Sequence, residues 1–522
     1  MSEKKMTIAT GHLLSLLATA ATLLWAAGAN AAAPGIIGPT FNLTARPAYI
    51  AQPDGNMVYS WGYGCAVAPA GFSPGAISNA TCPSMQVPGP TLIVTEGDLV
   101  TVNLANGLPP AAGNTSILFP GFSVITTGGV AGLLTQEATP GHAVTYTFLA
   151  TTAGTRAYYS GTQGDLQVEM GLYGAIIVLP DLQKTPTACT SGLAAANLLA
   201  EATWGERDFR HATAAYAHAK TCYDREYLFQ FSEIDPKIHA QALDQVTALG
   251  NCIAGNPGCS LNVPTEPYVP AYFMINGRSM PDDMDPNYTP QYPHQPYNGN
   301  PHMHPGEQVL LRIIGQGRWQ HPFHEHGNHV RILARDGNLI LSQTDASSLA
   351  GPLLFTTTTT PGQAMDGIFY YTGRGLNWDM YGHNPNATLA CTPDANGYNT
   401  GDPTAKNYFE WCQDHNKPLE AKPFGNVGSG GPVTLPDANI VANGAWYGGS
   451  PYLGPDGNMR AVGSTPIPPS GTVANSPTNE AGFAFMWHSH NEREITTNNV
   501  FPGGMLMMML VDSREFLIDE SN

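Results

Sequence analysis

Short apolar runs separated by Gly, Pro and Asn dominate the chain from about residue 41 to residue 178. Runs of this length and composition indicate β-strands joined by tight turns. The clearest predicted strands are 91–94, 99–104, 143–148 and 175–179. Several short strands at such spacing are typical of a sandwich or a barrel.

The pattern changes between about residues 184 and 250, where alanine becomes frequent. The spacing predicts short helices at 211–220 and at 239–249, the second with Ala240, Leu243, Val246 and Leu249 on one side. The strand-like run 227–231 within this region is predicted to open a second domain. Later strands are predicted at 272–276, 308–314, 329–334, 353–360, 365–371, 483–488 and 505–511.

A long stretch from about 377 to 480 is rich in Gly, Pro, Asn and Asp, and it reads as a loop insertion within the second domain. A loop of this length is unusual unless it is functional or internally ordered. We therefore predict residues 32–181 as one strand-rich domain, 182–224 as a linker with short helices, and 225–522 as a second strand-rich domain that contains the insertion.

Composition narrows the function classes. Of 522 residues, only 12% are charged, 57 are Gly and 44 are Pro, which fits a loop-rich all-β exported protein. The formal charge of −18 argues against a nucleic-acid partner. After the N-terminal segment, no apolar run is long enough to span a membrane.

The N-terminus has the parts of a secretory signal peptide, predicted to cover residues 1–31. Lys4 and Lys5 precede an apolar run at about 13–25, and Ala29-Asn30-Ala31 supplies the cleavage site. A periplasmic or secreted location follows, although an uncleaved signal acting as an anchor is an alternative. The eight cysteines are an even number, and structural disulfides are the simplest interpretation. Pairing of sequential cysteines would close short loops, but the sequence leaves the connectivity open.

Two His-x-His pairs are the main candidate site: His324 with His326, and His488 with His490. Side chains at i and i+2 of a strand point to the same face, so each pair can aim two imidazoles into one space. Four nitrogens on two strands would suit a metal, with Cu, Zn, Fe and Ni all compatible with imidazole. The alternative is that the pairs are relics that no longer hold metal.

With these residues stated, the chain resembles the multicopper oxidases, which are built from cupredoxin sandwiches. The resemblance rests on several spaced motifs: Pro88-Gly89-Pro90-Thr91, Glu96-Gly97-Asp98, Gly171-Leu172-Tyr173-Gly174, Ile275-Asn276-Gly277-Arg278-Ser279, Pro305-Gly306-Glu307, Pro361-Gly362-Gln363 and the two histidine stretches. It implies an all-β fold of two cupredoxin-like Greek-key sandwiches with a partly helical linker. It also implies one or two copper ions, a small-molecule or metal-ion substrate, and a homo-oligomer, with a trimer as the form seen in two-domain relatives.

By position, the resemblance makes His324, His326, His488 and His490 ligands of a copper cluster and His321 a ligand of a separate blue copper. The chain departs from the family elsewhere. The two first-domain histidine motifs read Leu118-Phe119-Pro120-Gly121 and Tyr159-Ser160-Gly161. Ser489 stands in place of the blue-copper cysteine, and Glu494 in place of a histidine. Because a blue-copper site needs a thiolate, we expect no ordinary laccase-type oxygen reduction.

Other polar residues near these motifs have a structural explanation beside the functional one. His321, Glu494 and Met505 are additional metal candidates, but a core histidine, a solvated carboxylate and a core methionine are the ordinary alternatives. Glu492, like Glu494, could reach a metal or act as a base, and a solvated carboxylate is its ordinary alternative. His302 and His304 form another His-x-His pair, which we assign to a loop.

The sequence thus predicts an exported multicopper-oxidase-like protein that binds copper through two His-x-His pairs and acts as an atypical oxidoreductase without a blue copper. The alternative is a non-enzymatic copper-binding or partner-binding protein. The catalytic residues and the substrate cannot be read from the sequence.

Overall fold

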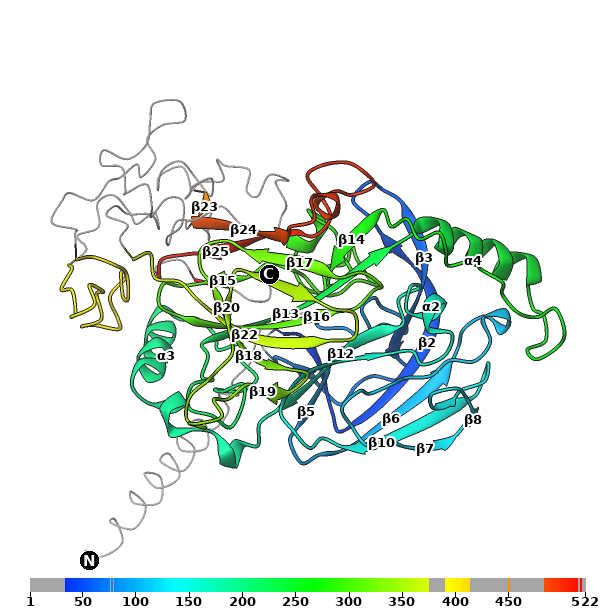
Figure 1. Cartoon of the computed structure of the whole chain (residues 1–522), viewed down its shortest axis with the longest axis horizontal. Helices are drawn as coiled ribbons and strands as arrows, with labels where there is room; N and C mark the ends of the chain where they lie inside the picture. Colours follow the sequence, from blue (N-terminus) through cyan, green and yellow to red (C-terminus); the bar gives the residue numbers. More distant parts are fainter. Residues whose placement is uncertain are drawn as a thin grey trace, which may run out of the picture.

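The computed structural model describes residues 33–75, 77, 79–374, 390–413, 449–450, 483–514 and 517–518. Two β-sandwiches lie side by side in Figure 1, the first drawn in blue and cyan and the second mainly in green and yellow. The predicted signal peptide and most of the predicted insertion at 377–480 lie outside the described residues. The all-β, two-sandwich cupredoxin-like class is confirmed.

The first sandwich packs two five-stranded sheets around one core. One sheet has the order β11-β12-β5-β1-β4 and the other β3-β2-β6-β10-β7. The bounds are β1 (Gly35–Ile37), β2 (Thr40–Ala51), β3 (Met57–Cys65), β4 (Phe72–Ser73), β5 (Leu92–Thr95), β6 (Leu99–Asn106), β7 (Ile125–Gly128), β10 (Ala143–Leu149), β11 (Gly154–Tyr159) and β12 (Tyr173–Leu179), with a separate hairpin of β8 (Val130–Ala131) and β9 (Gln136–Glu137). Along β6 and β10 buried residues alternate with more exposed ones, so each strand presents one face to the core.

The second sandwich packs a sheet of order β14-β13-β16-β22-β18-β19 against a sheet of order β15-β25-β24-β17-β21. Their bounds are β13 (Arg225–Ile234), β14 (Tyr272–Ile275), β15 (His302–Met303), β16 (Gln308–Gly315), β17 (His321–Glu325), β18 (Val330–Arg335), β19 (Asn338–Leu339), β21 (Thr356–Thr359), β22 (Ala364–Tyr370), β24 (Phe483–Ser489) and β25 (Leu506–Val511), while β20 (Leu353–Leu354) pairs with β18 and β23 (Gly449–Ser450) with β24. Aromatic and methionine side chains of both sheets fill the core between them, including Phe323, Trp487 and Met507.

Strand β13 is buried at all ten positions because it runs between β14 and β16 and lies close to the first sandwich. Its Ser232 accepts a hydrogen bond from Tyr173 of the first sandwich at 2.7 Å. Similarly, Thr155 Oγ1 donates to Asp366 at 2.6 Å across the two sandwiches. These buried hydrogen bonds hold the two sandwiches against each other.

Short helices occupy the connections, with bounds η1 (Pro110–Ala112), α2 (Gly164–Gln167), η2 (Leu182–Lys184), η3 (Thr187–Thr190), α3 (Leu193–Trp204), α4 (Pro236–Leu249), η4 (Asp282–Met284) and η5 (Glu492–Ile495). Asp235 caps α4 by accepting from the Lys237 N–H, and Pro236 suits the first helical turn. Ile238 and Ala242 of α4 are buried against the first sandwich. The helix predicted at 239–249 is therefore confirmed within a longer one.

The helix predicted at 211–220 is wrong, since this segment forms bends and turns. Ala214 instead forms a β-bridge with Cys222, and the Thr221 hydroxyl donates to the carbonyl of His218. The Tyr216 hydroxyl reaches Asp366, which fixes the segment against the second sandwich. Tertiary contacts of these polar groups thus outweigh the helix propensity of alanine.

The eight cysteines form four disulfides, as predicted, and the structure supplies the connectivity that the sequence left open: Cys65 with Cys82, Cys189 with Cys222, Cys252 with Cys259, and Cys391 with Cys412. Disulfides are typical of proteins that fold in an oxidising compartment. Within the described residues, no helix combines the length and the apolar character needed to cross a bilayer.

Candidate metal centre

The two histidine pairs meet where β17 and β24 lie antiparallel. The register places His324 opposite His488 and Phe323 opposite Ser489. Each strand ends before the second histidine of its pair, since β17 ends at Glu325 and β24 at Ser489. His326 and His490 therefore follow the strand ends, and strand alternation alone does not set the direction of their rings.

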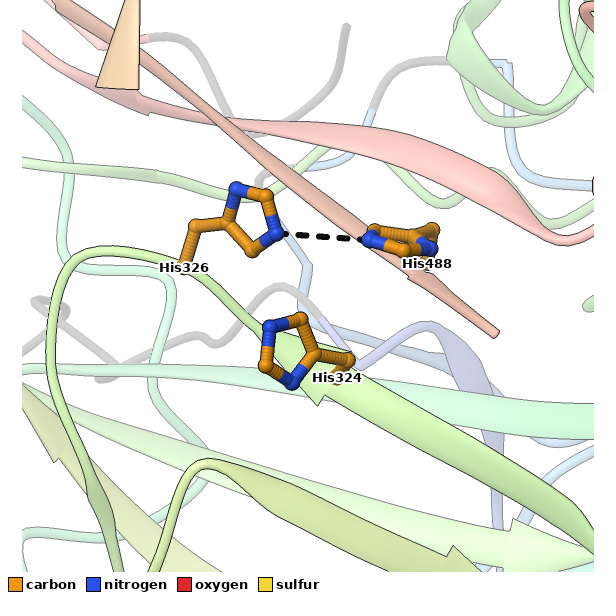
Figure 2. Close-up of side chains that lie close together, drawn as sticks. All are labelled: His324, His326 and His488. Atoms are coloured by element: carbon orange, nitrogen blue, oxygen red, sulfur yellow. Dashed lines mark hydrogen bonds between the residues drawn. The ribbon is translucent and has the colours of Figure 1, made fainter. Parts of the chain in front are cut away.

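Three of the four imidazoles form a compact group. One ring nitrogen from each of His324, His326 and His488 lies within 4.8 Å of the others, and Figure 2 shows the three rings facing a shared space. Among the described residues this is the group of His, Cys, Asp and Glu side chains that could hold a metal ion. The Nε2 atoms of His326 and His488 are 3.3 Å apart.

His490 lies beside this group. Its ring centroid is 4.8 Å from that of His324 and 5.5 Å from that of His488. Its side chain is 52% exposed, and its Nδ1 lies 3.4 Å from the exposed carboxylate of Glu492. The structure thus brings three predicted ligands together and leaves the fourth at the solvent side.

The electrostatics of the cluster favour neutral imidazoles. Burial, followed by the charges of His326, His488 and His490, lowers the pKa of His324 to about 4. Burial also lowers the pKa of His488, mainly by opposing the charged form. Neutral imidazole is the form that binds a metal, so these residues have the correct protonation state near neutral pH.

Hydrogen bonds outside the cluster orient two of its rings. The Nδ1 of His488 donates to the backbone carbonyl of Ser489 at 2.8 Å, so the neutral ring carries its lone pair on Nε2. The Nδ1 of His324 lies 2.7 Å from the Thr356 hydroxyl on β21. The Trp487 indole N–H donates to the carbonyl of His326 at 2.9 Å. Such outer partners fix the ring that presents the ligand atom.

The donor set fits copper. Three imidazole nitrogens, two from the paired strands β17 and β24 and one from the residue after β17, match the ligand type that Cu(II) and Cu(I) accept, and a fourth imidazole lies nearby. Because the rings already converge, binding would need little rearrangement of the backbone. The residues that would hold the ion are His324, His326 and His488, with His490 within reach of the same space.

His321 lies in a different environment on the same strand. Its Nδ1 is 2.9 Å from Glu494 Oε2 and its Nε2 is 3.0 Å from Glu233 Oε2, with all three side chains inaccessible to solvent. Burial lowers the pKa of His321, but the hydrogen bonds that its ring donates to these carboxylates outweigh burial and raise the pKa to about 9. An imidazole with a proton on each nitrogen has no lone pair to offer a metal.

The two other metal candidates, Glu494 and Met505, are both buried. Glu494 is fully buried and binds His321, so the solvated carboxylate expected as its ordinary interpretation is wrong. Met505 is fully buried within the core of the second sandwich, and its backbone N–H donates to the carbonyl of Glu494 at 2.8 Å. The Met505 side chain therefore contributes to the apolar core.

The second His-x-His pair, which we assigned to a loop, belongs to a buried ionic network. His302 lies on the short strand β15, and His304 follows it. The His304 ring contacts Glu206 at 2.7 Å, and Glu206 also binds Arg225 at 2.6 Å. The pair is therefore buried and has a structural role, and it is not a feature of an irregular loop.

The positions of the missing first-domain histidines lie together and are filled by packing. Leu118 forms a β-bridge with Tyr159, its N–H donating to the Tyr159 carbonyl at 2.7 Å. Tyr158 packs against Phe119 with ring centroids 5.8 Å apart, and its hydroxyl donates to the carbonyl of Pro90. Apolar and aromatic side chains thus fill the positions where the two histidine motifs were expected.

Sequence reasoning missed two residues that contact the candidate histidines, Glu233 and Thr356. Glu233 is a charged residue near the end of the otherwise strand-like run of β13, and it is 2% exposed. A buried carboxylate needs a partner, so its place in such a strand was the available signal. Thr356 lies in a row of five threonines, which gives no signal that singles it out.

Comparison with known proteins shows a similarity to multicopper oxidases over part of the chain. Residues 74–183 match the sequence profile described as multicopper oxidase. A segment of 98 residues is 39% identical to the multicopper oxidase MCE of Talaromyces pinophilus, covering 18% of this chain and 15% of that protein. A segment of the same length is 37% identical to the laccase abr2 of Aspergillus fumigatus, covering 18% of this chain and 16% of that protein.

Solved structures of multicopper oxidases align with more of the chain at lower identity. The multicopper oxidase mgLAC aligns with a TM-score of 0.43 and 16% identity, over 91% of this chain and 86% of that one. The blue copper oxidase of Nitrosomonas europaea gives a TM-score of 0.43 and 16% identity over 90% and 85%. The chain thus contains a segment, residues 74–183, that matches the multicopper oxidase family, and the matched segments span only a small part of the curated relatives.

Proposed function

We propose that this chain is an exported copper-binding protein that holds one or two copper ions through His324, His326, His488 and His490. The observation that supports this most directly is the convergence of three ligand nitrogens within 4.8 Å. The lowered pKa values of His324 and His488 and the hydrogen bond that orients the His488 ring support the same conclusion. Copper is preferred over zinc because of the family.

We further propose that the protein is an atypical oxidoreductase without a blue copper. The family's electron route passes through a cysteine thiolate, whereas Ser489 supplies a hydroxyl that is not ionised near neutral pH. A small molecule or a metal ion would therefore have to exchange electrons with the histidine-bound copper directly. The exposed side of His490 offers a direction of approach.

A non-enzymatic copper-binding role is the second candidate function. It is favoured by the environment of His321, where two carboxylates occupy both ring nitrogens and leave no route for electrons from a second copper. In this role the histidine cluster would store or transfer copper without turnover.

We also propose a location, a domain division and an assembly for this chain. Four disulfides and the N-terminal pattern support export to the periplasm or the cell exterior. The division at residues 181 and 224, with the signal peptide before residue 32, remains our proposal for the domains. A homotrimer is proposed only from two-domain relatives, and ultracentrifugation of the mature protein tests it.

Equilibrium dialysis of metal-free protein against Cu(II) tests the copper site. The wild-type protein should bind one or two ions, and a variant carrying His326→Ala and His488→Ala should lose them. His142→Ala, which removes an exposed histidine of the first sandwich, is the matched control and should bind like the wild type. Equal uptake by the wild type and the double variant would contradict the proposal.

Oxygen uptake by the copper-loaded protein then separates the two candidate functions. With phenols or reduced metal ions as substrates, turnover that disappears in the double variant would support the oxidoreductase. Bound copper that gives a paramagnetic resonance signal but no oxygen consumption would support the non-enzymatic role.

A further inference from the structure

The Glu494 carboxylate is the centre of a buried network that joins three segments of the second sandwich. Its Oε2 is 2.9 Å from His321 Nδ1 on β17 and accepts from the Ser489 hydroxyl on β24 at 2.5 Å. Its Oε1 accepts from the Asn491 side-chain amide at 2.8 Å. Glu494, His321 and Ser489 are each 0% exposed.

The far side of His321 is closed by a second carboxylate. Glu233 Oε2 lies 3.0 Å from His321 Nε2, while Glu233 Oε1 accepts from the backbone N–H groups of Arg318 and Trp319 at 2.7 and 2.8 Å. The Tyr268 hydroxyl lies 3.2 Å from the same oxygen. Both nitrogens of His321 thus face carboxylates that are themselves held in place, Glu233 by backbone N–H groups and Glu494 by the side chains of Ser489 and Asn491.

This network lies where the family resemblance assigns a mononuclear copper, and its residues do not fit that ion. A blue-copper centre needs a thiolate and two imidazoles. Here the thiolate is replaced by the Ser489 hydroxyl and one imidazole by the Glu494 carboxylate. In addition, one oxygen of that carboxylate already lies within hydrogen-bond distance of both His321 Nδ1 and Ser489 Oγ.

We infer that the Glu494 carboxylate takes the place of a metal ion at this point of the fold, linking β17 to β24 and to the loop that follows β24. A metal at this position would connect the same three side chains by coordination. The carboxylate connects them by charge-assisted hydrogen bonds, which are the stronger class of hydrogen bond. The Glu494 side chain thus occupies the position that a copper ion would take, and copper is excluded.

The same link makes Glu494 a positioning residue for the histidine cluster. Ser489 stands between His488 and His490, and the Asn491 N–H donates back to the Ser489 hydroxyl at 3.2 Å. The carboxylate therefore fixes the end of β24 from which both imidazoles project. This second consequence rests on the proposed copper site, whereas the exclusion of copper from the network does not.

Substitution of the two residues that depart from the family tests the exclusion. Ser489→Cys alone should bind no more Cu(II) than the wild type and should stay colourless, because the carboxylate still lies between the thiol and His321. Ser489→Cys combined with Glu494→His should bind one additional copper and show the intense blue absorption of a copper thiolate. Ser513→Cys, at another fully buried serine, is the matched control. It should stay colourless when it is loaded with Cu(II) under the same conditions as the double variant.

A blue Ser489→Cys single variant would overturn the inference, since Glu494 would then not exclude the metal. A folded double variant with no additional copper would overturn it as well, since the three positions would not share one centre. Both readings count copper at this network alone, so they stand even if the wild-type protein binds no copper at its histidine cluster.

Glu494→Gln provides a further measurement that needs no new metal site. It keeps the side-chain shape and removes the charge, so Cu(II) affinity at the histidine cluster should fall roughly tenfold to a hundredfold, the usual effect of losing an outer-shell partner. Glu226→Gln, which removes a buried carboxylate bound to Arg312, is the control for general destabilisation and should keep the affinity. Equal affinities in Glu494→Gln and the wild type would contradict the positioning role.

Discussion

The histidine cluster and the His321 site share strand β17 but differ in the groups that surround their imidazole rings. His324 and His488 face other imidazoles across the join of β17 and β24. His321, three residues before His324, faces a carboxylate on each side. The two positions differ by three, so their side chains lie on opposite faces of β17 and meet different partners.

The partners set the charge of each ring. Burial and neighbouring imidazoles lower the pKa of His324 to about 4, whereas Glu233 and Glu494 raise the pKa of His321 to about 9. Near neutral pH the first ring is neutral and able to bind a metal, and the second is a cation that stabilises two buried anions. A histidine at a family ligand position is therefore informative only together with its hydrogen-bond partners.

The largest expected effect comes from removing His321. His321→Leu leaves Glu233 and Glu494 buried without their shared cation, and breaking a buried ion pair in this way costs about 3–5 kcal/mol. In the metal-free protein, His324→Leu should cost less than about 1 kcal/mol, because it removes a neutral ring from a crowded polar group. Urea unfolding at pH 7 measures both free energies.

The comparison would fail if the two leucine variants lost similar free energies of unfolding. His142→Leu, at an exposed position of the first sandwich, provides the baseline for a histidine with little structural role. Its free energy of unfolding should match that of the wild type within the error of the measurement.

The pH dependence of stability gives the next largest effect. Because folding raises the pKa of His321 above its ordinary value near 6.5, the stabilisation is fully present below pH 6.5 and is lost as the pH rises through about 9. The loss between pH 6 and pH 10 amounts to at most about 3 kcal/mol, since one pKa unit is worth about 1.4 kcal/mol. His321→Gln has no titrating ring and should lack this component.

Urea unfolding of the wild type and His321→Gln at intervals from pH 6 to pH 10 measures the component as a difference. The gap between the two proteins should narrow toward alkaline pH. A gap that stays constant, or that widens, would show that His321 is not held as a cation by its two carboxylates.

The strands and the histidine pairs could be predicted from the sequence because they depend on local patterns. The run 308–314 falls within β16, and 143–148 falls within β10, since apolar periodicity reports which face is buried. The cluster could be predicted in outline because two His-x-His pairs on strands tend to converge. The fate of His490 could not, because β24 ends one residue before it and exposes its ring to solvent.

The network around His321 could not be predicted because it is made by residues far apart in the chain. Glu233 on β13 and Glu494 in η5 reach His321 from two different elements, and no spacing in the sequence relates them. The same holds for residues 211–220, where contacts with distant side chains replace the helix that alanine favours. Local patterns predict elements, whereas the protonation of a buried ring depends on the fold that surrounds it.

The smallest effect concerns the outer partner of the cluster on β21. Thr356→Val keeps the shape of the side chain and removes the hydroxyl that lies 2.7 Å from His324 Nδ1. The ring then loses the contact that fixes its rotation, so Cu(II) affinity should fall about tenfold, at the low end for losing an outer-shell partner. Competition with a Cu(II) chelator of known affinity measures the change.

Thr358→Val is the matched control because Thr358 lies on the same strand with an exposed side chain. It makes the same chemical change without touching a histidine, so it should retain the wild-type affinity. If Thr356→Val also retained that affinity, hydrogen bonding at Nδ1 would not determine how His324 presents its other nitrogen. The contrast between the two environments on β17 would then rest on charge alone, with no contribution from ring orientation.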